Sequence, residues 1–161
     1  MPTWGFFKGK EIDRKTYGIY TKGAAIWSDI DVVLQNEDAN AATIIVYAYF
    51  DSGHSWVKPR DATNKALQHE LGHFNITEIY ARKLRRQCNE TIFTKRNLFK
   101  ELTQLYNDHL TKLEKAQTEY YVETMHSTNE AYQKQWEEMI KIQLKETEAF
   151  ENIYLTVRVK G

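Results

Sequence analysis

The chain has 161 residues, enough for one domain with a core of reasonable size. Its 22 basic and 22 acidic residues balance, which excludes a global attraction to nucleic acid or to an anionic membrane. The single cysteine, Cys88, excludes an internal disulfide and the cysteine-rich zinc motifs. From the balanced charge we expect no nucleic-acid partner. Because no apolar run is long enough to span a bilayer, we also expect no membrane span.

Residues 1–60 have a composition typical of β-structure. The run TIIVYAYF at 43–50 is rich in β-branched and aromatic residues and predicts a strand. Two shorter strands are expected around Gly23, within residues 17–34. The loop DSGHSWVKPR follows and contains Pro59, which is the last proline, so no later proline interrupts a helix.

Residues 61–150 have the periodicity of helices. Asp61 or Thr63 can cap the first helix, which has an inward stripe spaced at three and four residues. This stripe consists of Ala62, Ala66, His69, His73, Ile76, Tyr80 and Leu84. Further helices are expected at about 91–118 and 129–150, and the alternating tail at 152–159 predicts a final strand. We therefore expect a single α+β domain over 1–161, with a small antiparallel sheet in the N-terminal third packed on a helical C-terminal part.

The segment HELGH places two histidines on one face of the first predicted helix. His69 and His73 are four residues apart and can bind one metal ion together. Glu70 lies about 100° around the helix from His69, beside such a metal rather than on it. There it can accept a proton from a metal-activated water, as in the H-E-x-x-H arrangement of two zinc ligands and a general base. The competing interpretation is an ordinary helix that carries two incidental histidines.

A catalytic zinc also needs a third protein ligand and an open position for water. Glu78 is close to His73 in sequence, but helix geometry turns it about 160° away from the histidine pair. A helix over 119–130 would instead present a second stripe of possible ligands, in which His126 or Glu123 could complete the site. The stripe consists of Glu119, Glu123, His126 and Glu130.

The same residues allow a different metal centre. Glu70–His73 and Glu123–His126 are both Glu-x-x-His pairs, and two such pairs with two more glutamates define a ferritin-like di-iron bundle. The additional glutamates could be drawn from Glu101, Glu114, Glu137 and Glu148. The long β-type segment before the helices, and the absence of a role for His69, argue against this alternative.

Four blocks of sequence extend the motif beyond five residues. Residues 69–82 read HELGHFNITEIYAR, preceded by AYFD at 48–51 and SWVKP at 55–59. Downstream come Tyr120, Tyr121, Thr124, His126 and Ser127, and then Gln133 and Trp136. Together these blocks resemble a family of bacterial proteins, formerly of unassigned function, that are predicted to be secreted zinc-dependent proteases. The family strings are approximately H-E-Q-G-H-F-D-I-x-E-x-Y-A-R, Y-D-x-x-T-x-H-G and Q-x-x-W, and the resemblance covers about residues 24–145.

The resemblance implies a zincin-like architecture with the motif on a central helix, and a peptide or protein substrate. It implies zinc ligation by His69, His73 and His126, favours His126 over Glu123, and leaves Glu70 as the general base. The chain departs from the family pattern at Leu71, Asn75, Tyr121 and Ser127, where the family has Gln, Asp, Asp and Gly.

Other residues near the motif are candidates for supporting roles. Tyr120 or Tyr121 could steady an oxyanion because both are close in sequence to His126. Asn75, Glu78 and Glu123 are candidates for orienting the metal ligands. The strand at 43–50 is the candidate sheet edge along which a substrate strand would pair.

Two further expectations concern activity and location. The hypothesis from another class is a zincin-like binding module without catalysis, although the presence of Glu70 favours an enzyme. The segment MPTWGFFKGKEIDRK lacks the features of a signal peptide, so we expect a cytosolic protein or a processed mature form. The resemblance implies export to the periplasm or surface of a bacterium.

Overall fold

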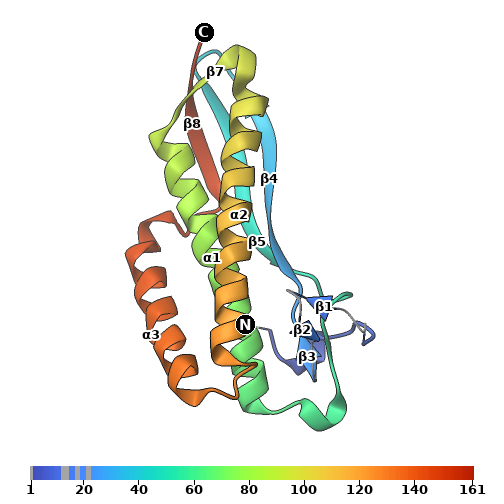
Figure 1. Ribbon diagram of the computed structural model, residues 1–161. Coiled ribbons are helices and arrows are strands. Elements are labelled where there is room, and N and C mark those ends of the chain that lie inside the picture. The colour runs from blue at the N-terminus through green and yellow to red at the C-terminus, as the bar shows by residue number, and fades with distance from the viewer. Residues whose placement is uncertain (1, 12–14, 17–18, 21–22) are drawn as a thin grey trace.

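The computed structural model combines a layer of helices with a mainly antiparallel sheet. It describes residues 2–11, 15–16, 19–20 and 23–161. Within these residues the α-helices are α1 (Asn64–Glu90), α2 (Leu98–Thr124) and α3 (Glu130–Glu146). Figure 1 shows α1 and α2 between the long strands on one side and α3 on the other. The predicted α+β class is therefore confirmed.

The main sheet has the strand order β4-β5-β8-β7. A long hairpin joins β4 (Ser28–Glu37) to β5 (Ala41–Phe50), and β8 (Tyr154–Lys160) pairs antiparallel with β5. The unpredicted strand β7 (Ile92–Thr94) pairs parallel with β8. The expectation that residues 43–50 form a sheet edge is wrong for the first part of this range, because residues 42–45 of β5 pair with β8 on one side and with β4 on the other. The pairing with β8 ends at Ile45, whereas the pairing with β4 continues to Phe50.

Short elements lie beside the first half of α1 (Figure 1). Strand β1 (Lys15–Thr16) pairs with β2 (Ile19–Tyr20), and β3 (Ala24–Ala25) pairs with β6 (Trp56–Val57). The two strands predicted around Gly23 correspond in part to β2, β3 and the start of β4, while residues 17–18 and 21–22 lie outside the described residues. Four 3₁₀ turns complete the described elements: η1 (Trp4–Phe6), η2 (Pro59–Asp61), η3 (Lys95–Asn97) and η4 (Glu148–Phe150).

The hydrophobic core lies between the main sheet and the helices. Alternate residues of β5 point inward, so Ala42, Ile44 and Val46 are buried while their neighbours face outward. Each long helix adds a buried stripe to this core. These stripes include Ile76, Ile79 and Leu84 from α1, Leu98, Leu102 and Leu113 from α2, and Trp136 and Ile140 from α3.

Capping residues explain where the helices begin. The side chain of Thr63 accepts a hydrogen bond from the Ala66 N–H at 3.1 Å, which confirms the predicted cap on α1. Asn129 similarly accepts from the N–H of Tyr132 at the start of α3. The sequence pattern placed the ends of the helices less well, because α3 stops at Glu146 rather than at about 150.

The predicted helical stripe over residues 119–130 is wrong. Helix α2 ends at Thr124, and Met125, His126 and Ser127 all have positive φ angles, of 47°, 54° and 63°. Left-handed residues cannot continue a right-handed helix. His126 therefore leaves the axis of α2 and lies in a tight turn between α2 and α3.

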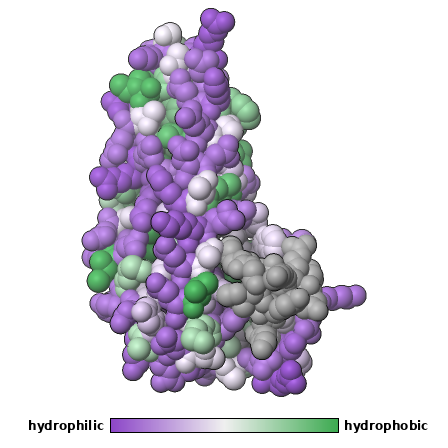
Figure 2. Space-filling model, in the orientation of Figure 1, coloured by the Kyte–Doolittle hydropathy of each residue, from purple (hydrophilic) through white to green (hydrophobic). Residues whose placement is uncertain are grey.

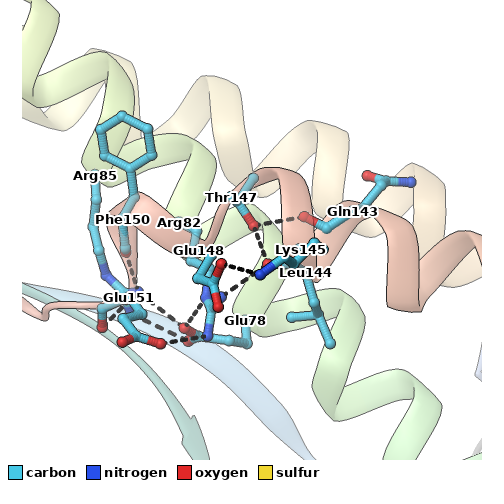
Figure 3. Close-up of polar contacts among 10 residues, drawn as sticks. All are labelled: Glu78, Arg82, Arg85, Gln143, Leu144, Lys145, Thr147, Glu148, Phe150 and Glu151. Carbon is cyan, nitrogen blue, oxygen red and sulfur yellow. Dashed lines mark hydrogen bonds and ion pairs between the residues drawn. The ribbon is translucent and has the colours of Figure 1, made fainter.

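An ion-pair cluster joins α1 to the chain that follows α3 (Figure 3), and its Arg85 also bonds the sheet at Val46. Arg85 is only 1% exposed, and its guanidinium donates to Glu78, to the carbonyl oxygen of Val46 and to that of Phe150. Arg82 donates to the same Glu78 carboxylate at 2.7 Å. Because these bonds link three separate segments, the cluster holds β5 and the end of η4, shortly before β8, against the middle of α1.

The surface view in Figure 2 shows hydrophobic residues scattered among hydrophilic ones. Much of this hydrophilic surface belongs to the charged outer faces of the helices. Among the described residues, none of the helices combines the length and apolar character needed to cross a membrane.

Candidate metal centre

The histidines of HELGH are buried where α1 begins, α2 ends and α3 begins. Figure 1 shows these three helix ends meeting beside β3. His69 and His73 are 2% and 9% exposed, and their ring centroids are 5.0 Å apart. Burial lowers the pKa of His69 to about 4 and that of His73 to about 3. Both imidazoles are therefore neutral near pH 7, the form that binds metals.

Two glutamine side chains hold the rings of these histidines. The Nδ1 atom of His69 lies 3.0 Å from Gln133 Oε1 on α3, and the Nδ1 atom of His73 lies 2.5 Å from Gln117 Oε1 on α2. The amide nitrogen, Nε2, of each glutamine forms a second hydrogen bond that fixes the orientation of the amide. Gln117 Nε2 donates to the His73 carbonyl oxygen at 2.9 Å, and Gln133 Nε2 donates to Glu137 at 3.0 Å.

The orientation of the amides determines the tautomer of both rings. An amide oxygen only accepts hydrogen bonds, so each Nδ1 must carry the proton and donate it. In a neutral imidazole the lone pair is then on Nε2. The Nε2 atom of His69 is buried and forms no hydrogen bond with the described residues. A buried lone pair of this kind fits a metal ligand, and the hydrogen bond at the opposite nitrogen is the usual support for one.

His126 approaches this pair from the turn after α2. Its ring centroid is 6.0 Å from that of His69 and 4.0 Å from that of Tyr121. Three imidazoles bound tetrahedrally to one zinc through bonds of about 2.1 Å place their centroids about 5 Å apart. The His69–His73 separation matches that spacing, and His126 is about 1 Å too distant. In the described part of the chain, no three His, Cys, Asp or Glu side chains are already grouped as a metal site.

Glu70 lies between the two histidines in sequence and faces strand β3. It is 5% exposed, and its Oε2 accepts a hydrogen bond from the Ile26 N–H at 2.8 Å. Burial raises the pKa of Glu70 to about 7, although the Ile26 hydrogen bond acts in the opposite direction. A carboxylate with a pKa near 7 can both accept and release a proton at neutral pH.

Tyr120 packs against both histidines and has a fully engaged hydroxyl. Its ring stacks on His69 at 4.8 Å, and its hydroxyl donates to the His69 carbonyl oxygen at 3.0 Å and accepts from Gln133 Nε2 at 3.1 Å. Gly72 permits this close packing, because a Cβ there would lie 2.7 Å from Tyr120 Cζ. Tyr120 thus supports the backbone and the histidine rings, and its hydroxyl points to α1.

Tyr121 lines a cavity of about 410 Å³ together with Glu70, His73 and His126. Burial raises the pKa of Tyr121 to about 12, which keeps its hydroxyl protonated and able to donate at neutral pH. Of the two tyrosines expected near the reaction, Tyr121 is the one placed along this cavity.

The remaining predicted residues lie outside the immediate cluster. Glu123 accepts from the Trp136 indole N–H at 2.7 Å, and Glu78 belongs to the Arg82 and Arg85 cluster. Asn75 is half-buried on α1 and makes no side-chain hydrogen bond within the described ranges. The side chains that orient the histidines are therefore Gln117 and Gln133.

Neither Gln117 nor His54 belongs to a sequence pattern that predicts a role in the site. Gln117 is a buried amide on the apolar face of α2, and a polar residue at such a position was the available signal. His54 lines the same cavity as Tyr121, and its Nδ1 lies 2.7 Å from the Asp51 carboxylate. His109 is a structural residue, since it is 4% exposed and its Nδ1 bonds the Leu105 carbonyl oxygen.

Comparisons with protein-family models, with curated proteins and with solved structures found no match to this chain.

Proposed function

We propose that this chain is a zinc-dependent peptidase, with His69, His73 and His126 as metal ligands and Glu70 as general base. The observation that carries the proposal is the pair of glutamine amides, which leave the Nε2 lone pairs of His69 and His73 available. Glu70, on the same helix, lines the cavity with His73 and His126, as the H-E-x-x-H arrangement requires.

A zinc ion bound there would supply a Lewis acid that polarises a peptide carbonyl and acidifies a water molecule. Glu70 accepts the proton of that water and delivers it to the leaving amine. The Ile26 N–H fixes one oxygen of this carboxylate. Tyr121 is positioned along the cavity to donate a hydrogen bond to the developing oxyanion. Zincin-like architecture and export from a bacterial cell belong to the same proposal, on the resemblance of the sequence.

The di-iron alternative has less support. Glu123 and His126 do not share a helical face, because α2 ends at Thr124. A ferritin-like centre also draws on four helices, whereas the described residues form three α-helices.

The proposal is tested by metal content, measured by mass spectrometry on protein purified without a metal-affinity step. We expect about one zinc per chain, sharply reduced in His126→Ala and retained in His109→Ala, which removes a buried histidine elsewhere on α2. Cleavage of fluorescently labelled casein should be lost in Glu70→Gln while zinc is retained.

The other possible outcomes of the metal and cleavage measurements lead to different conclusions. Zinc without cleavage would make the chain a non-catalytic zincin-like binding module. Two irons per chain would favour the di-iron centre. A wild type without metal, and a His126→Ala variant that behaves identically, would overturn the peptidase proposal.

A further inference from the structure

Two cavities of different size meet at the candidate metal centre. The larger measures about 410 Å³ and the smaller about 210 Å³, and Glu70 and His126 line both. His73 lines the larger cavity and His69, one helical turn earlier on α1, lines the smaller. The two cavities therefore lie at different heights along α1, one on each side of the candidate metal centre. A peptide bound across the centre would place one of its halves in each cavity.

The walls of the larger cavity are mainly aromatic and aliphatic. Trp27 and Trp56 contribute from the segments around β3 and β6, and Leu110, Leu113 and Tyr121 contribute from α2. Trp27 is 43% exposed, so its indole offers apolar surface that a ligand can cover. Cavities of this size with mostly apolar walls and few polar groups are typical of ligand sites.

The charged residues of the larger cavity are all of one sign, apart from its histidines. Asp29 and Glu114 line it in addition to Glu70, and no Lys or Arg is among its described lining residues. An acidic side chain would therefore lose its hydration and meet the like charges of Asp29 and Glu114, with no Lys or Arg among the described lining residues to pair with it.

The smaller cavity has a mainly polar lining, unlike the larger one. Its lining includes Arg60, Asp61, Thr63 and Ser127, and the Arg60 guanidinium lies 3.5 Å from the Asp61 carboxylate. Its volume is about half that of the larger cavity. It suits small or polar groups rather than large apolar ones.

We propose that the larger cavity determines specificity, accepting a large aliphatic or aromatic side chain next to the cleaved bond and rejecting Asp and Glu. This inference rests on the proposed peptidase activity. Leu110 and Trp27 cover the apolar side chain, and Glu114 and Asp29 supply the discrimination against acidic residues.

The experiment is cleavage of a library of tryptic peptides, with the cut sites sequenced by mass spectrometry. For the wild type we expect cuts beside Leu, Phe, Met or Tyr, enriched about 10- to 100-fold over cuts beside Ala. Sites beside Asp and Glu on the same side of the bond should be depleted. The enrichment of large apolar residues should occur on only one side of the cleaved bond. The residue on the other side would enter the smaller cavity, which is polar and does not favour large apolar side chains.

Matched variants test which lining residues of the larger cavity determine the preference for large apolar side chains. Leu110→Ala and Trp27→Ala should reduce the preference by about 10-fold. Leu105→Ala, another half-buried leucine of α2, and Phe99→Ala, an exposed aromatic of α2, should preserve it because neither residue lines the cavity. Glu114→Lys, at an exposed position, should admit cuts beside Asp and Glu.

A flat cleavage profile that still disappears in Glu70→Gln would overturn this inference and leave the peptidase proposal standing. An equal loss of preference in the Leu110 and Leu105 variants would also overturn it. No cleavage by the wild type would overturn both proposals.

Discussion

The side-chain amide of Gln117 is bonded to His73 at both of its ends. Its Nε2 donates to the His73 carbonyl oxygen at 2.9 Å, while its Oε1 lies 2.5 Å from the Nδ1 atom of the same residue. One side chain on α2 thereby fixes the rotation and the tautomer of a ring on α1. Gln133 on α3 acts on His69 in a similar way.

Removal of these amides should weaken zinc binding without removing a ligand. We expect Gln117→Leu and Gln133→Leu to lower zinc affinity by about 10- to 100-fold, because the rings lose the bonds that orient them. Competition with a chromophoric chelator measures the affinity. Gln143→Leu is the control, since this α3 glutamine accepts from Lys83 away from the site. Imidazole nitrogen chemical shifts of the metal-free wild type should show the Nδ1–H tautomer for His69 and His73. If the wild type and both glutamine variants show the same mixture of tautomers, the prediction is contradicted.

Gly72→Ala should destabilise the protein, although alanine normally favours a helix. The new Cβ would lie 2.7 Å from Tyr120 Cζ, and Tyr120 is fully buried between His69 and Trp136. We expect a loss of about 1–3 kcal/mol in the free energy of unfolding, from overpacking. Urea denaturation measures it, with Gly5→Ala as the control because its Cβ would have a nearest contact of 3.7 Å. An increase in stability for Gly72→Ala would show that Tyr120 moves aside freely.

Arg85→Met should be far more costly than the same change at the next residue. Arg85 is 1% exposed, and its loss removes one of the two arginines that donate to Glu78 and the guanidinium that donates to the carbonyl oxygens of Val46 and Phe150. We expect a loss of about 3–5 kcal/mol in the free energy of unfolding. Arg86→Met removes an ion pair with Glu90 in which both side chains are 60% exposed, so solvent screens the pair and the unfolding midpoint should hardly change. Equal effects in thermal or urea unfolding would contradict the structural role of Arg85.

Cys88 should be inert in the folded protein. Its side chain is fully buried, and burial raises the pKa of the thiol from 9.0 to about 12. A higher thiol pKa lowers the fraction of reactive thiolate at pH 8, by about a thousandfold here. Ellman's reagent should therefore titrate no thiol in the native state and one thiol per chain in guanidinium. Rapid native-state labelling would mean that the core opens locally.

Ser127→Gly should stabilise the turn that carries His126. Ser127 has a φ of 63°, which costs a residue with a Cβ about 1 kcal/mol or more and costs glycine little. The melting temperature should rise for Ser127→Gly and fall for Thr128→Gly, because Thr128 is not among the positive-φ residues. A lower melting temperature for both variants would contradict this prediction. It would mean that the Ser127 side chain stabilises the turn by more than its positive φ destabilises it.

The sequence predicted the parts of the fold that have long patterns. Strand β5, strand β8 and the start of α1 at Thr63 followed from alternation, periodicity and capping chemistry. Strand β7 has three residues between two helices, too few for a pattern to emerge. The outward position of β4 depends on β8 joining the hairpin from the far end of the chain, which no local pattern encodes.

Spacing along the chain predicted the part of the candidate site that lies within one helix, while His126 came from the family resemblance. The four-residue spacing of His69 and His73 gave their common face directly. The end of α2 was missed because no glycine or proline marks Met125, His126 and Ser127 as left-handed. Gln117 and Gln133 carry no spacing signal, since their role arises from tertiary packing.

The hydrogen bonds that orient the histidines join residues 44 and 64 positions apart in the chain. During folding, neither ring can acquire its fixed tautomer while α1 is an isolated helix, because the necessary amides arrive with α2 and α3. The ligand geometry therefore requires α2 and α3 to be packed against α1. A fragment that ends before α3 would keep the whole HELGH sequence and lose the amide that orients His69.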